Sequence, residues 1–179
     1  MSPLLTTTQW VLLSVYPLTL AWAMVSDARH LMIPNWTCII IAAAYLPAAL
    51  LGPVDISVIA LHYGVGAGLF LAGLYPYSRG LIGGGDLKLL AAAGIWIGWN
   101  DLWSYLLLVA LLGGALAVLV LIAHRLQKRL PFLDKVEWLK GGDGPVKPIP
   151  YGIAIGLGAG FLFPGNAALP PSWAAALGG

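Results

Sequence analysis

Six long apolar runs divide the chain, and short segments rich in glycine, proline and polar residues separate them. A helix needs roughly 20 apolar residues to cross the hydrocarbon core of a bilayer. The fourth run is shorter than this, because at about 1.5 Å per residue it covers only about 21 Å of a roughly 30 Å core. The pattern predicts an all-α, polytopic membrane protein, a six-helix transmembrane bundle. The expected helices are residues 7–25, 35–52, 56–75, 87–100, 102–123 and 149–164.

The composition indicates the same class of protein. Hydrophobic residues make up 60% of the 179 residues and charged residues only 9%, whereas soluble domains carry about 25% charged residues. We therefore expect one membrane domain, residues 1–179, with membrane lipids and no nucleic acid among its partners. The first run is interpreted as a retained helix, because residues 1–10 contain no Lys or Arg and a signal peptide begins with basic residues.

The basic residues all fall on one side of the predicted bundle. They follow the first, third and fifth runs or begin the fourth, and the other connections contain none. The positive-inside rule makes this side cytoplasmic and places both termini outside. Within the predicted cytoplasmic loop 124–148, residues 124–140 are expected to lie along the membrane surface near anionic lipids or to form a plain solvated loop. The nine residues are Arg29, Arg79, Lys88, Arg125, Lys128, Arg129, Lys135, Lys140 and Lys147.

Glycines recur in pairs four residues apart within the apolar runs. Small residues at this spacing let helix backbones approach each other inside a membrane bundle. We therefore predict that each pair lies at a contact between helices. The pairs are Gly64 and Gly68, Gly94 and Gly98, and Gly156 and Gly160.

Two aspartates differ from the other acidic residues in their placement. Asp27 ends the first predicted helix in "SDARHLMIPN", and Asp86 opens the fourth in "GGGDLKLLAAAGIWIG". Both lie at the predicted cytoplasmic boundary, and an acidic side chain at membrane depth is a candidate functional site. Each also has a structural interpretation, Asp86 as a helix N-cap and Asp27 as an ion-pair partner of Arg29. Two carboxylates on one rim favour a functional pair.

The surroundings of the two aspartates suggest a reaction. Gly83, Gly84 and Gly85 carry no side chains, so a backbone strand can lie against them. The start of a helix favours charge on Asp86, and the end of a helix disfavours charge on Asp27. Two carboxylates in such opposite environments are expected to share one proton and to act as acid and base in peptide hydrolysis. The alternative is a small proton- or ion-coupled transporter that uses the pair as a relay.

These segments resemble the signature segments of the type IV prepilin peptidases, which are GxGD membrane aspartic proteases. Residues 83–86 match GxGD, Lys88 matches a family position, and "IPYGIAIGLGAG" (149–160) resembles the family's closing helix. The resemblance implies a helical bundle that cleaves the basic leader peptide from pilin-like precursors at the cytoplasmic face of a prokaryotic inner membrane. It implies Asp27 and Asp86 as the catalytic pair. We expect Gly83, Gly84 and Gly85 to shape the substrate site, and Lys88 either to share that role or to snorkel toward the lipid headgroups.

One departure from the family narrows the expected activity. Its long members carry an additional N-terminal domain with cysteine pairs, linked to N-methylation of the new N-terminus, whereas this chain has a single cysteine, Cys38. The chain resembles the short, peptidase-only members that serve tight-adherence (Flp-type) pili. We therefore expect an aspartic endopeptidase without N-methyltransferase activity. We expect no metal or organic cofactor, because water can reach the site from the cytoplasm.

Overall fold

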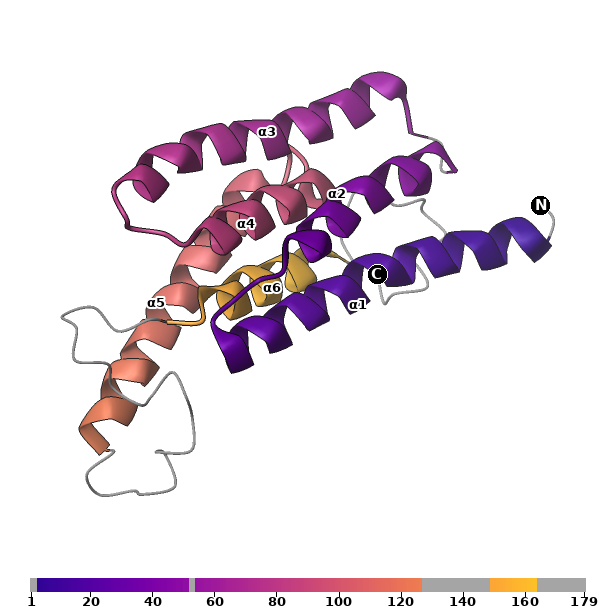
Figure 1. Ribbon diagram of the computed structural model, residues 1–179. Coiled ribbons are helices and arrows are strands. Elements are labelled where there is room, and N and C mark those ends of the chain that lie inside the picture. Colours follow the sequence, from indigo (N-terminus) through magenta and orange to yellow (C-terminus); the bar gives the residue numbers. More distant parts are fainter. Residues whose placement is uncertain (1–2, 52–53, 127–148, 164–179) are drawn as a thin grey trace.

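The computed structural model describes residues 3–51, 54–126 and 149–163. Six α-helices and no strand form within these residues, which confirms the all-α prediction. Most of segment 124–148 lies outside the described residues. The helices, drawn in Figure 1, are α1 (Pro3–His30), α2 (Asn35–Leu50), α3 (Ile56–Ser78), α4 (Gly84–Ile97), α5 (Leu102–Leu126) and α6 (Tyr151–Leu162).

Consecutive helices run in alternating directions, so one end of the bundle collects the ends of α1, α3 and α5 and the starts of α2, α4 and α6 (Figure 1). We call this the aspartate end, because Asp27 and Asp86 lie there. Three of the described helices are long and apolar enough to cross a membrane, over Val11–His30, Ile56–Ser78 and Leu102–Ala123. The other three are shorter, and α4 has only 14 residues. The chain is therefore an integral membrane protein.

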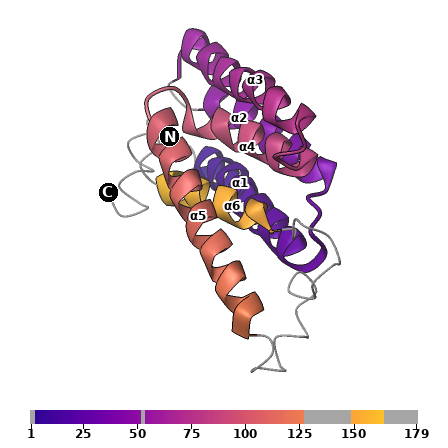
Figure 2. The same ribbon diagram turned by 90° about the vertical axis from the view of Figure 1, so that its left-hand side faces the viewer.

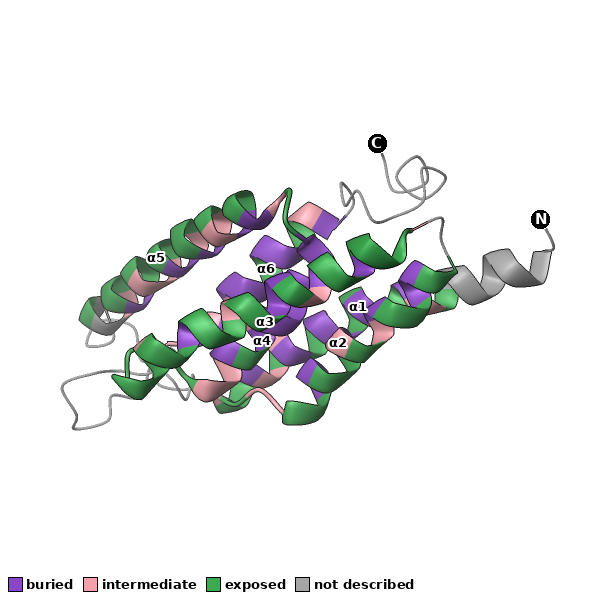
Figure 3. Cartoon of the chain, turned by 90° about the horizontal axis from the view of Figure 1, so that it is seen from above, coloured by how far each residue is buried: buried purple, intermediate pink, exposed green. Residues whose placement is uncertain are grey.

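The short helix α4 lies at the centre of the bundle. It packs against α2, α3 and α6 and touches α5, and Figure 2 shows α3 and α5 on opposite sides of the group formed by α1, α2, α4 and α6. In Figure 3 the buried residues gather at this centre, whereas α5 lies at an edge with an exposed outer face. Nine residues of α4 are buried, and four of them, Ala91, Ala92, Ala93 and Gly94, are small. Small residues allow several helices to approach α4 closely.

Glycine residues set both ends of α4. Gly83 has an extended backbone and is the N-cap of the helix. Gly98 follows the last helical residue with φ at 73°, a left-handed conformation that a residue with a Cβ adopts only with strain. The His62 ring lies where a Cβ of Gly98 would be. The helix therefore ends inside the bundle, and the chain turns directly into α5.

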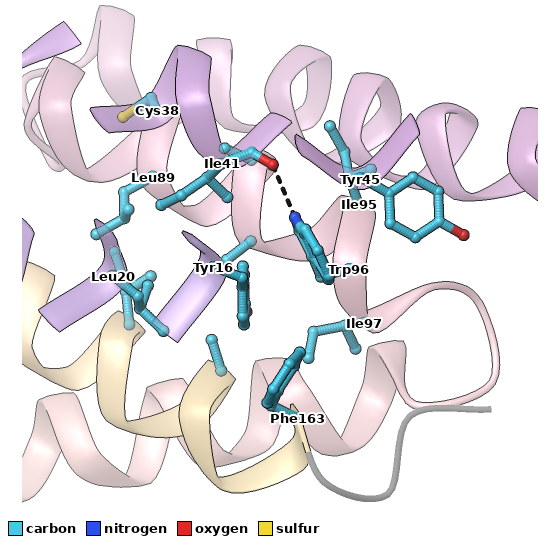
Figure 4. Close-up of a cluster of buried hydrophobic side chains, with 14 of the residues drawn as sticks. Tyr16, Leu20, Cys38, Ile41, Tyr45, Leu89, Ile95, Trp96, Ile97 and Phe163 are labelled. Atoms are coloured by element: carbon cyan, nitrogen blue, oxygen red, sulfur yellow. Dashed lines mark hydrogen bonds between the residues drawn. The ribbon is translucent and has the colours of Figure 1, made fainter. Parts of the chain in front are cut away.

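Trp96 joins three helices in the core (Figure 4). Its indole N–H donates a hydrogen bond of 2.7 Å to the backbone carbonyl of Ile41 in α2. Its ring stacks on Tyr16 of α1, with 4.5 Å between ring centroids, and forms T-shaped pairs with Tyr45 and Phe163. Aromatic pairs of this kind contribute about 0.5–1.5 kcal/mol each beyond burial of their area. Trp96 therefore fixes α4 against both α1 and α2.

The predicted glycine pairs are wrong in part. A Cβ added at Gly64, Gly68 or Gly160 would meet no atom within 4 Å, so these three glycines lie at no helix contact. A Cβ added at the remaining three would meet a side chain of another helix: Gly94 faces Leu69, Gly98 faces His62 and Gly156 faces Met24.

Two further glycines, which were not predicted, lie on the α3 side of the contact between α3 and α4. A Cβ at Gly66 would collide with the side chain of Ile95, and one at Gly73 would collide with Leu87. The reason for the error is physical. Apart from His62 and the serines near its ends, apolar or weakly polar residues surround α3, so hydrophobicity says little about which face meets another helix.

A pair of alanine substitutions in α3 should have opposite effects. Gly66→Ala should lower the free energy of unfolding by about 1–3 kcal/mol, because the new methyl group overpacks the contact with Ile95. Gly64→Ala should raise it by up to about 1 kcal/mol, because the added methyl group meets open space and alanine favours the helix. Denaturant unfolding of the purified protein in detergent measures both. Equal effects of the two substitutions would contradict this packing.

Candidate active site

Asp27 lies in the last turn of α1 and is 5% exposed. Its backbone carbonyl accepts a 2.9 Å hydrogen bond from the N–H of Leu31, which ends the helix. Leu31 has φ at 51°, in the left-handed region that residues other than glycine rarely adopt. The hydroxyl of Ser26 donates a 2.8 Å hydrogen bond to the carbonyl of Met32, across the same turn. The turn after α1 is therefore tight, and it holds the Asp27 side chain at the aspartate end.

Asp86 is the third residue of α4, because the helix begins at Gly84. The N-cap is Gly83, so the interpretation of Asp86 as an N-cap is wrong. Its carboxylate folds back over the N-cap, and a Cβ at Gly83 would lie 2.8 Å from Asp86 Oδ2. An acid at the third helical position faces the N-cap backbone in this way in a capping box. The first turn of α4 therefore orients the Asp86 carboxylate.

The two aspartates line one cavity, of about 250 Å³. The cavity lies between the turn that follows α1 and the start of α4, and backbone of the three glycines forms part of its wall. Within the residues that the structure describes, no three His, Cys, Asp or Glu side chains gather as ligands of a metal ion. The lining residues are Asp27, Leu31, Met32, Ile33, Gly83, Gly84, Gly85 and Asp86.

The environment of Asp86 changes its acidity. Burial, and secondly the negative charge of Asp27, raise the pKa of Asp86 to about 6, although the backbone of Gly83 acts in the opposite direction. Burial disfavours the charged form of a carboxyl group, and a neighbouring carboxylate disfavours it further. Asp86 can therefore hold and release a proton closer to neutral pH than an ordinary carboxyl group, whose pKa is about 3.9.

Gly152 completes the surroundings of Asp27, and the sequence did not reveal it as a site residue. Its backbone N–H, in the first turn of α6, donates a 2.7 Å hydrogen bond to Asp27 Oδ2. A Cβ at this position would lie 2.8 Å from Asp27 Oδ2 and 2.8 Å from the side chain of Ile33. The start of α6 thus provides an N–H group to Asp27. The prediction that charge on Asp27 is disfavoured considered only the end of α1 and did not include this group. Among the described residues Asp27 forms no ion pair with Arg29.

The segment Pro150-Tyr151-Gly152 attaches α6 to the rest of the bundle through three different contacts. Pro150 is buried and is the N-cap of the helix. The hydroxyl of Tyr151 donates a 3.4 Å hydrogen bond to the carbonyl of Val109 in α5. The next residue, Gly152, then reaches Asp27. The "IPYG" segment, which carries part of the family resemblance, is the sequence signal that could have revealed this contact.

The other site residues from the sequence differ in their placement. Gly84 and Gly85 line the cavity, but the space beside them is taken by this chain's own Tyr77 and Ile33, each within 3.2 Å of the position that a Cβ would occupy. Lys88 does not line the cavity. It is exposed on α4, and its ammonium group donates a 2.8 Å hydrogen bond to the side chain of Asn35.

The protein is an apolar helical bundle with two aspartates in one cavity. It therefore belongs to the class of integral membrane proteins that have a candidate acid–base site between helices. Residues 14–118 match the type IV leader peptidase family. This match covers more than half of the chain, so the chain belongs to that family. It includes Asp27, Asp86 and the three glycines before Asp86, whereas Gly152 lies beyond it.

One curated relative is the prepilin leader peptidase/N-methyltransferase of Bacillus subtilis (strain 168). It is 34% identical over 108 residues, which are 60% of this chain and 43% of the relative. The aligned part is therefore less than half of the relative's length. No solved structure matches the chain.

Replacement of Gly152 tests the contact between α6 and Asp27. Gly152→Ala should lower the free energy of unfolding by about 1–3 kcal/mol, because its methyl group would press against the carboxylate and Ile33. Gly160→Ala is the matched control in the same helix, because a Cβ there meets open space. Thermal unfolding in detergent compares the two. The contact is refuted if both variants unfold like the unmodified protein.

Proposed function

We propose that the protein is an aspartic endopeptidase that removes the leader peptide from type IV pilin-like precursors. The observation that carries the proposal is the meeting of Asp27 and Asp86 in one cavity, within the residues that match the leader peptidase family. The name of the curated relative includes the same activity. Paired carboxylates in unlike environments are the arrangement that peptide hydrolysis by acid–base catalysis needs.

The geometry supports a division of roles between the carboxylates. The N–H of Gly152 stabilises negative charge on Asp27 Oδ2 against the burial of this side chain, and we assign Asp27 the role of the base. Asp86, with a pKa of about 6, holds the proton and acts as the acid. Asp27 takes a proton from a water molecule, and the oxygen of that water bonds to the scissile carbonyl carbon. At the same time Asp86 protonates the carbonyl oxygen. The proton on Asp27 then passes to the leaving amine as the C–N bond breaks. Asp86 recovers its proton from a hydroxyl group of the tetrahedral intermediate as the carboxyl product forms.

The proposal places the aspartate end at the cytoplasmic face of a prokaryotic membrane. Four basic residues lie at or next to helix ends at the aspartate end: Arg29, Arg79, Lys88 and Arg125. The positive-inside rule favours the cytoplasm for such an end. The apolar helix of the precursor would remain in the membrane, and the basic leader would remain in the cytoplasm. The backbone at Gly83 and the open side of the cavity would receive the scissile segment.

Amide variants of the two aspartates test the proposed roles. Asp27→Asn and Asp86→Asn should each lower cleavage by at least about a hundredfold, because an amide neither accepts nor donates the catalytic proton. Asp27→Asn keeps an oxygen that can accept the Gly152 N–H, so the fold should remain. Asp55→Asn is the control, because Asp55 is exposed at the other end of the bundle. Cleavage of a purified pilin precursor, followed by mass spectrometry, gives the rates. Normal cleavage by either site variant would disprove the pair.

The pH dependence of cleavage tests the role of Asp86 as the acid. The acid must carry a proton, and a carboxyl group loses its proton as the pH rises through its pKa. Because the pKa of Asp86 is raised to about 6, kcat/KM should remain high at mildly acidic pH and fall as the pH rises above that value. An ordinary carboxyl group would lose this activity near about pH 4. A rate that is constant or rising between about pH 5 and pH 8 would rule out this assignment.

The absence of N-methyltransferase activity stays a prediction. The curated relative carries both activities in its name, and the proposed function covers leader removal only. Mass spectrometry of the processed pilin N-terminus distinguishes a free amine from a methylated one.

A further inference from the structure

A second and larger cavity lies on the other side of α4 from the aspartates. Its volume is about 410 Å³, within the range of about 300–1,000 Å³ that is typical of small-molecule sites. It is a groove with α4 as its floor and α2 and α3 as its walls. It shares no lining residue with the aspartate cavity. The groove is lined by Asn35, Cys38, Ile39, Ala42, Gly66, Phe70, Lys88, Ala91, Ala92 and Ile95.

The polar groups of the groove are concentrated at one end. Lys88 and Asn35 belong to the starts of α4 and α2, so they lie at the aspartate end of the bundle. Lys88 Nζ donates to Asn35 Oδ1 at 2.8 Å, which uses one of its three donors on a neutral amide. Within the described ranges Lys88 forms no ion pair with an acidic residue. Among these residues no acidic group neutralises its positive charge.

The remainder of the groove is apolar. Cys38, Ala42, Ala91 and Ala92 are small, which leaves room above the floor. Along α4 the groove reaches from Lys88 to Ile95, about 10 Å at 1.5 Å per residue. A hydrocarbon chain can lie along an apolar floor of this length. The space therefore fits a hydrocarbon chain that begins at a negatively charged group.

We propose that this groove binds an anionic phospholipid, with its phosphate at Lys88 and Asn35 and one acyl chain along the apolar floor. Basic pockets between membrane helices bind anionic lipid headgroups by this chemistry. Lys88 follows Asp86 by two residues, and the buried Leu87 lies between them. The headgroup would therefore lie beside the first turn of α4, outside the aspartate cavity. The lipid site is independent of the proposed peptidase activity.

Retention of lipid by the full-length protein tests the site. The protein is purified in detergent, mixed with equal amounts of phosphatidylglycerol and phosphatidylcholine, and examined by native mass spectrometry. Lys88→Gln removes the charge, and Arg79→Gln is its control, because Arg79 is exposed at the same end but lies outside the groove. Ala42→Phe fills the groove, and Ala43→Phe is its control, because the neighbouring Ala43 is exposed and outside it.

The unmodified protein should retain phosphatidylglycerol about fivefold more than phosphatidylcholine, and Lys88→Gln should remove this preference, as expected for one cation at a headgroup. Ala42→Phe should reduce retention of both lipids, while both control variants behave like the unmodified protein. The proposal is overturned if the unmodified protein shows no preference, or if Lys88→Gln keeps it. It is also overturned if an apolar precursor-helix peptide binds in place of lipid and Ala42→Phe weakens only that peptide, because the groove would then belong to a helix.

Discussion

The enclosure of α4 by its neighbours is the constraint on which the rest of the bundle depends. A helix of 14 residues covers about 21 Å, so its ends stop short of at least one face of a roughly 30 Å hydrocarbon core. The unpaired backbone groups at such ends cannot face lipid and must lie against protein or in a wet cavity. Small residues along α4 let α2, α3 and α6 close around it, and Trp96 fixes it to Ile41. The start of α4 can then open into a polar cavity inside the bundle.

Different parts of the chain hold the two aspartates in their shared cavity. Asp86 is positioned locally, by the first turn of α4 and its glycine N-cap. Asp27 is positioned by a tight turn after α1 and by a distant N–H group at the start of α6. The carboxylates therefore differ in burial and in hydrogen bonding although they share a cavity. The proposed roles, with Asp86 as the acid and Asp27 as the base, rest on this difference.

Much of the arrangement could be predicted from the sequence, because the signals were strong. The apolar runs gave six helices, and the boundaries near residues 35 and 56 agree with the starts of α2 and α3. Asp27 and Asp86 could be paired because each ends or begins a run on the side that holds the basic residues. The facing glycines were not predicted, since α3 has apolar residues on every side, and Gly66 and Gly64 look alike in the sequence. The role of Gly152 depends on a contact across 125 residues, so the "IPYG" segment could mark Gly152 but not its partner, Asp27.

The hydrogen bond between Asp27 and Gly152 also has a consequence for how the molecule is made. Chains are synthesised from the N-terminus at about 5–20 residues per second, so roughly 6–25 s pass between the two residues, which are 125 positions apart. During that time α1 and α4 can already be in the bilayer, but the carboxylate of Asp27 lacks its N–H partner. The cavity acquires its complete set of contacts only when α6 has been inserted. Assembly of the site is thus a late event of biosynthesis, and a partly made chain does not contain it.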